Sequence, residues 1–170
     1  AITMLLLVTP TLIVIPMSFS ESQYLEFPPK NWSTRWYEHY FSSPEWMLAT
    51  VTSLKAAFLT MLVATPIGVV AAYGLHASKV KFIRIAFVLL ITPMMVPVVL
   101  VAIGAFYAYV KLGILYTLTG LVLAHTILAL PLVLIVTGSA LKSYDMNQEL
   151  AARSLGAPRW KAFLTITLPQ

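Results

Sequence analysis

The chain has no cysteine and very few charged residues. Asp, Glu, Lys and Arg together make up only 10% of its 170 residues, and 59% of the sequence is hydrophobic. The missing cysteine excludes disulfides and thiolate metal sites within these residues. A soluble domain usually carries about 25% charged residues. A core of this size could not bury so much apolar surface, so we expect a membrane protein.

Acidic residues are missing from the four long apolar runs, which cover about 2–19, 46–75, 85–110 and 118–141. All four are too long and too uniformly apolar for strands, and backbone groups in lipid must be satisfied within the segment. We therefore predict an all-α, polytopic transmembrane helical bundle with about four spans. The lack of intramembrane carboxylates argues against a cation-coupled carrier.

The sequence also lacks any recognisable catalytic pattern. It has no phosphate-binding loop, no nucleophile elbow and no paired histidine zinc motif. We expect no enzyme activity, no catalytic residue and no metal ligand or cofactor on this chain. Any energy source must then lie on another chain.

The first apolar run starts at once, with no initiator Met and no basic flank. We expect the natural N-terminus to be missing. A signal peptide that ends near residues 18–20 is the alternative, but the further apolar spans favour a transmembrane helix.

Basic residues are distributed unevenly between the loops. The loop 76–84 and the tail 142–170 hold seven of them, whereas the segments 20–45 and 111–117 hold three. The positive-inside rule therefore places the loop 76–84 and the tail in the cytoplasm and the loop 20–45 outside. The net charge of +5 does not indicate nucleic-acid binding, because the basic residues are scattered between apolar runs.

The outer loop 20–45 is rich in aromatic residues, some of which we expect at the headgroup level. A short interfacial helix over 33–41, capped by Ser33, is expected within it. The loop is either a solvated connector or a docking surface for an outside partner.

Four residues within the spans are candidates for lining a translocation pathway. Pro93 and Pro97 each remove a helix hydrogen bond and can kink the helix, as a hinge, as a cavity lining or as simple irregularity. His125 is an ionisable group inside a span, although a neutral packing role is open too. Pro131 follows it by six residues.

The tail has strong local helix signals. Asp145 can cap a helix, with Gln148 reaching back as in a capping box. Glu149 precedes Arg153 by four residues, the favourable order for a helix-surface pair. Gly156 suits the left-handed residue after a helix, and the small pair Ala151-Ala152 lets another surface approach closely. We predict a helix–turn–helix element on the cytoplasmic surface.

This tail resembles a known motif. Glu149-x-Ala151-Ala152-x-x-x-Gly156, then nine residues, then Ile166-x-Leu168-Pro169, is similar to the EAA loop of binding-protein-dependent ABC importer permeases. Leu150 departs from it, because the acid stands one place earlier, at Glu149. Other segments resemble the spermidine/putrescine subfamily in its order, across nearly the whole chain: Phe27-Pro28-Pro29, Ser33-Thr34-Arg35-Trp36-Tyr37, Ser53-Leu54, Gly68, Ala71-Ala72-Tyr73, Pro93, Pro97, His125 and Leu130-Pro131.

The resemblance implies a type I importer permease fold in the bacterial inner membrane. A second permease subunit, identical or different, would complete the pathway, and an extracytoplasmic solute-binding protein would deliver the solute. A cytoplasmic ABC ATPase dimer, with its ATP and Mg, would bind the coupling loop 142–170. The residues implied for this contact are Asp145, Glu149, Ala151, Ala152, Gly156, Ile166, Leu168 and Pro169. Such permeases have two more helices after this loop, so residues 1–170 are expected to be one incomplete permease domain.

The function predicted is the permease subunit of an ABC importer, with a polyamine as the favoured solute. The spans hold no acid to receive a polyamine, so amino-phosphonates, opines, iron and other small solutes remain open. An ATP-independent channel or secondary carrier, and a membrane anchor or scaffold, are the alternatives.

Overall fold

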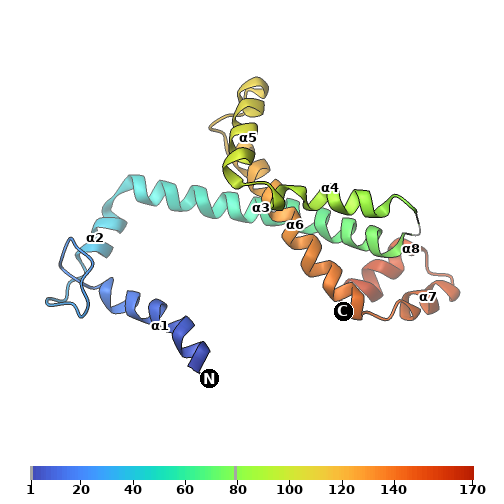
Figure 1. Ribbon diagram of the computed structural model, residues 1–170, viewed down its shortest axis with the longest axis horizontal. Coiled ribbons are helices and arrows are strands. Elements are labelled where there is room, and N and C mark those ends of the chain that lie inside the picture. Colours follow the sequence, from blue (N-terminus) through green and yellow to red (C-terminus); the bar gives the residue numbers. More distant parts are fainter. Residues whose placement is uncertain (1, 79) are drawn as a thin grey trace. The chain divides into compact units, whose positions relative to one another are not determined.

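The computed structural model describes residues 2–78 and 80–170, so Lys79 of the basic loop 76–84 lies outside the described residues. The chain folds into helices joined by turns and loops (Figure 1), and the expectation of an all-α fold is confirmed. The elements in chain order are α1 (Ile2–Met17), α2 (Arg35–Ser42), α3 (Pro44–Ala77), α4 (Ile83–Met95), α5 (Val98–Leu112), α6 (Leu118–Ser143), α7 (Asn147–Ser154), α8 (Arg159–Ala162) and the π-helical turn η1 (Phe163–Thr167).

The chain divides into two units, Ala1–Leu54 and Lys55–Gln170. In the first unit, the loop after α1 is held against α2 by aromatic side chains. The Tyr37 ring packs on Phe19 with centroids 5.1 Å apart, and its hydroxyl lies 2.7 Å from Ser18 Oγ. The Trp36 indole N–H donates to the Ser22 carbonyl at 3.3 Å. These contacts give the loop a fixed shape.

The short helix expected at 33–41 is α2, and its cap differs from the expectation. Thr34 occupies the cap position and makes no capping hydrogen bond from its side chain. Ser33 Oγ instead accepts from the Arg35 backbone N–H at 3.1 Å. A serine can bond the amide two residues on in this way, as a turn that precedes the helix.

Two helices, α3 and α6, are long and apolar enough to cross a membrane. They begin and end within two residues of the runs 46–75 and 118–141. The bent pair α4–α5 raises the number of such spans to three if it is counted as one, and α1 is a shorter apolar helix. By length and composition, the described residues therefore contain two or three full-length candidate spans, and the number of four spans stays a prediction.

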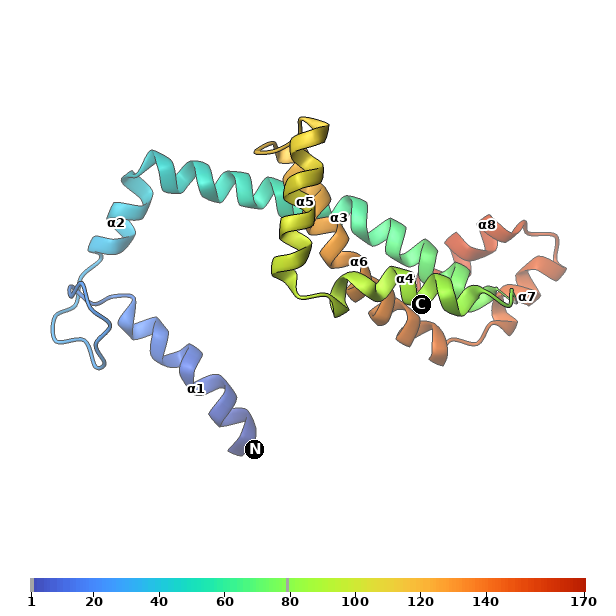
Figure 2. The same ribbon diagram turned by 45° about the horizontal axis from the view of Figure 1, so that its top comes forward.

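The expected span 85–110 is two helices rather than one. The chain bends by 99° between α4 and α5 (Figure 2). Val96 has an extended backbone with φ −83° and ψ 135°, as expected for a residue that precedes proline. Pro97 then begins α5 as its cap and has no N–H with which to continue α4.

The core of the second unit lies where α3 meets α6. Ala72 of α3 is buried against Leu134 and Leu141, with Leu90 of α4 packed beside them. The buried positions of α3 recur every four residues and form a small-residue stripe: Ala56, Thr60, Ala64, Gly68 and Ala72. Small side chains let helix backbones approach closely.

Candidate functional site

The segment after α6 folds into a loop of short helices that returns to α3. Asp145 Oδ1 accepts from the Asn147 backbone N–H at 3.0 Å, which forms a turn just before α7. Met146, not Asp145, occupies the cap position. The Gln148 side chain does not close a capping box, because its Oε1 accepts from Gln170 Nε2 at 2.7 Å.

Gly156 ends α7 with a left-handed backbone, as the sequence indicates. Its φ is +92°, a region that glycine adopts without the penalty of a Cβ. The Gly156 N–H donates to the Arg153 carbonyl at 3.0 Å, and the Ala157 N–H donates to the Ala152 carbonyl at 3.2 Å. These bonds satisfy two carbonyls at the end of α7 and reverse the chain into α8.

Glu149 lies inside this loop and is only 2% exposed. The Tyr73 hydroxyl of α3 lies 2.6 Å from one carboxylate oxygen and 2.7 Å from the other. Thr167 Oγ1 of η1 donates to Oε2 at 2.9 Å. Tyr144 OH, at the end of α6, lies 3.3 Å from Thr167 Oγ1. The acid therefore connects two elements of the loop, α7 and η1, to the long apolar helix α3.

The hydrogen bonds of Glu149 compensate for its burial. An isolated buried carboxylate costs several kcal/mol, whereas hydrogen bonds to a charged group contribute about 1.5–3 kcal/mol each. The Tyr73 ring also packs against the Phe163 ring, with centroids 4.5 Å apart. We call the side chains of Tyr73, Glu149, Thr167 and Tyr144 the Glu149 cluster.

Other residues expected at a partner contact lie on the surface of the loop. Ala151, Gly156, Leu168, Pro169 and Asp145 are exposed, whereas Ala152 and Ile166 are half-buried. Leu150 and Leu155 are 51% and 90% exposed. The loop thus presents a small, partly apolar outer surface and holds Glu149 within.

The four pathway candidates are spread over α4, the start of α5 and α6. Pro93 is half-buried inside α4, and Pro97 is exposed at the bend before α5. His125 is exposed on α6, whereas Pro131 of the same helix is fully buried. His125 and Pro131 therefore face different surroundings, and a shared pathway lining stays a prediction.

Sequence reasoning did not single out Tyr73 or Thr167 as partners of Glu149. Tyr73 carried a signal, since it is a polar aromatic residue near the end of an apolar run. Thr167 carried none, because it stands among apolar neighbours of the tail.

The fold and the loop together define a helical membrane protein with a compact element after its last long span. Residues 64–170 match the family described as binding-protein-dependent transport system inner membrane component. The match covers more than half of the chain, so the chain belongs to this family.

Curated relatives carry the same kind of description. The spermidine/putrescine transport system permease protein PotC of Haemophilus influenzae is 28% identical over 94% of this chain, and PotC of Escherichia coli K12 is 29% identical over 94%. The molybdenum transport system permease protein ModB of Escherichia coli K12 is 32% identical over 75% of this chain. The chain spans 62%, 60% and 61% of the lengths of these relatives.

Proposed function

We propose that this chain belongs to the membrane-spanning subunit of a solute importer and that a separate cytoplasmic ABC ATPase drives it. In this proposal α7 and the Gly156 turn are the segment that the ATPase binds. The observation that carries the proposal is the Gly156 turn within a matched permease segment, beside an outer surface built from small and apolar residues.

The outer surface of α7 suits a protein groove. Ala151 is exposed and has only a methyl side chain, so a partner can approach the α7 backbone closely. Leu155 is 90% exposed. Its full burial by a partner would contribute about 1.5–3 kcal/mol to the binding free energy. Asp145 and Ala152 at the base of α7, and Ile166, Leu168 and Pro169 farther on, complete the proposed contact surface.

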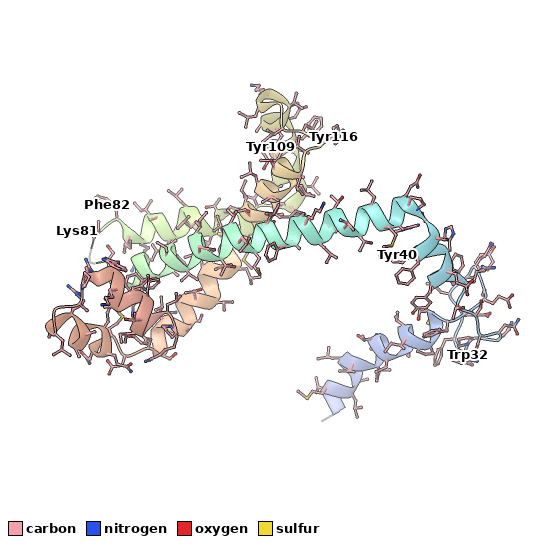
Figure 3. The ribbon with its side chains drawn as sticks, turned by 180° about the vertical axis from the view of Figure 1, so that it is seen from behind. Trp32, Tyr40, Lys81, Phe82, Tyr109 and Tyr116 are labelled. Atoms are coloured by element: carbon pink, nitrogen blue, oxygen red, sulfur yellow. The ribbon has the colours of Figure 1, made fainter. Side chains whose placement is uncertain are left out.

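The proposed orientation follows the charges. In this proposal the cytoplasmic side holds the tail 142–170 and the turn between α3 and α4. Figure 3 labels Lys81 and Phe82 in this turn. The loop 20–45 lies outside, where an extracytoplasmic solute-binding protein docks. A second permease subunit completes the pathway in the bacterial inner membrane, and ATP and Mg bind the ATPase rather than this chain.

A polyamine is the proposed solute, supported by the two PotC relatives and by their coverage of 94% of this chain. Selection of the cation then depends on the binding protein or the second subunit. Within the described residues of α1, α3, α4, α5 and α6, Glu45 is the single acid. The same scarcity of acids, together with Lys55 on α3 and the resemblance to ModB, supports an oxyanion as the second candidate.

The test uses the whole permease in cells that lack other uptake routes for the labelled solute. Gly156→Ala forces an alanine into a left-handed conformation, which costs about 1–2 kcal/mol and lowers the ratio of correctly turned to misturned loop by about 5- to 30-fold. Gly138→Ala is the matched control, because a Cβ at either glycine meets no atom within 4 Å and only Gly156 has positive φ. We expect spermidine uptake to fall in the first variant only.

Three outcomes would contradict parts of the proposal. Equal uptake by the two variants would remove α7 and its turn from coupling. Uptake that persists without any ATPase would favour a channel or secondary carrier. Uptake of labelled molybdate, with no uptake of labelled spermidine, would replace the polyamine by an oxyanion.

A further inference from the structure

Glu149 is the acid that the family resemblance would place against the ATPase, yet it is 2% exposed and faces inward. We propose that Glu149 is a positioning residue inside the permease: it fastens α7 to α3 through Tyr73 and to η1 through Thr167. A displacement of α7 by a partner is then passed directly to α3. The inference rests on the proposed function of α7 as the ATPase contact.

The directions of the hydrogen bonds in the Glu149 cluster follow from its chemistry. A carboxylate only accepts hydrogen bonds, so the Tyr73 and Thr167 hydroxyls both donate to it. Thr167 has one proton and uses it on Glu149, so the Tyr144 hydroxyl donates to Thr167 Oγ1. The cluster is therefore one connected series from α6 through η1 and α7 to α3, and such series reinforce their members.

The attachment to α3 is made twice at the same side chain. The Tyr73 hydroxyl bonds α7 through Glu149, and the Tyr73 ring packs on Phe163 of η1 with centroids 4.5 Å apart. The segments before and after Gly156, α7 and η1, are thus both fixed to one residue of α3. A helix held in this way moves with the loop rather than independently of it.

The position of Tyr73 on α3 gives the attachment a mechanical use. Tyr73 lies four residues before α3 ends, at Ala77. Gly68, five residues earlier on α3, faces Val133 of α6, whose Cγ1 would lie 2.5 Å from a Cβ built on the glycine. A force delivered at Tyr73 therefore reaches the contact between the two long apolar helices within about 8 Å along the α3 axis, at 1.5 Å per residue.

The experiment uses the whole permease with its ATPase and removes single groups. Tyr73→Phe deletes the hydroxyl and keeps the ring, and Thr167→Val deletes the hydroxyl and keeps the shape. Thr167→Ser restores the hydroxyl and is the rescue variant. Tyr116→Phe is the matched control, because Tyr116 is 95% exposed.

The first measurement is amide hydrogen exchange over α7, which needs no transport. Loss of a hydrogen bond to a charged group should speed exchange in α7 by about 10- to 100-fold in Tyr73→Phe and Thr167→Val. Tyr116→Phe and Thr167→Ser should match the unmodified protein. Unchanged exchange in Tyr73→Phe would overturn the proposal whatever the transported solute is.

The second measurement is the amount of solute taken up per ATP hydrolysed. The amount of ATPase that copurifies with the permease is measured in parallel. We expect the ratio to fall at least fivefold in Tyr73→Phe and Thr167→Val while the ATPase stays bound. Loss of ATPase binding in Glu149→Gln, with Tyr73→Phe unaffected, would make Glu149 a direct ATPase contact and overturn the inference. Uptake without any ATPase would instead refute the proposed function. The exchange measurement would still test whether Glu149 fastens α7 to α3.

Discussion

Gly68 is the point at which the packing of α3 on α6 can be perturbed by one methyl group. A Cβ built on Gly68 would lie 2.5 Å from Val133 Cγ1 and 2.8 Å from Val133 Cβ. Both distances are too short for carbon atoms, so Gly68→Ala forces the two helices to shift. Overpacking of this kind costs about 1–3 kcal/mol.

The helical preference of alanine over glycine opposes this cost by about 1 kcal/mol. Gly74→Ala measures that preference alone, since a Cβ at Gly74 of the same helix meets nothing within 4 Å. We expect Gly68→Ala to be less stable than Gly74→Ala by about 1–3 kcal/mol, the overpacking term by itself.

The assay is equilibrium unfolding of the whole purified permease in mixed micelles, followed by tryptophan fluorescence. Val133→Ala removes Cγ1, the nearer of the two Val133 atoms that a Cβ at Gly68 would meet, and keeps Val133 Cβ. In that background the stability deficit of Gly68→Ala should shrink, which gives a coupling energy of about 0.5–3 kcal/mol. If Gly68→Ala is as stable as Gly74→Ala, or if Val133→Ala rescues nothing, the close approach at Gly68 is wrong.

Three further predictions concern the other elements. Thr117 Oγ1 caps α6 by accepting from the Gly120 N–H at 3.0 Å, so Thr117→Ala should lower the free energy of unfolding by about 1 kcal/mol. The control Thr119→Ala changes an exposed residue within α6 and should lower it less. Spin labels at the far ends of α4 and α5 should lie about 30 Å apart because of the 99° bend, whereas a continuous helix would give about 45 Å. In a cysteine-free permease, an impermeant maleimide should label Ser22→Cys on intact cells and Leu155→Cys only after permeabilisation; the reverse pattern would refute the proposed orientation.

The long helices were predictable because their signal is local. About 20 apolar residues without an acid suffice to specify a span, and α3 and α6 match their runs closely. The short helix α2 was also foreseen, although its cap was placed one residue too early.

The bend between α4 and α5 was only partly predictable. Pro93 and Pro97 indicate an interrupted helix. A hinge, a cavity lining and a simple irregularity of the helix are all consistent with these two prolines. Pro93 turns out to lie inside α4, while the break falls at Pro97. The angle depends on how both helices pack against α6, which no local pattern contains.

The surroundings of Glu149 could not be predicted from the tail. An acid four residues before Arg153 on a helix is typical of an ion pair on the exposed helix surface. Its main partner, Tyr73, lies 76 residues away in the sequence. Burial of the acid is a consequence of how the loop folds back on α3, so the direction in which Glu149 points emerges only in the folded chain.

The small-residue stripe of α3 has a regular interval, so several placements of α3 along α6 would bring similar surfaces together. A slide by four residues, about 6 Å at 1.5 Å per residue, would set the methyl group of Ala64 or Ala72 against Val133 in place of Gly68. Only the glycine accepts Val133, so one missing methyl group selects a single register. Motion at this crossing is therefore expected to be a pivot about Gly68 rather than a slide along the helix.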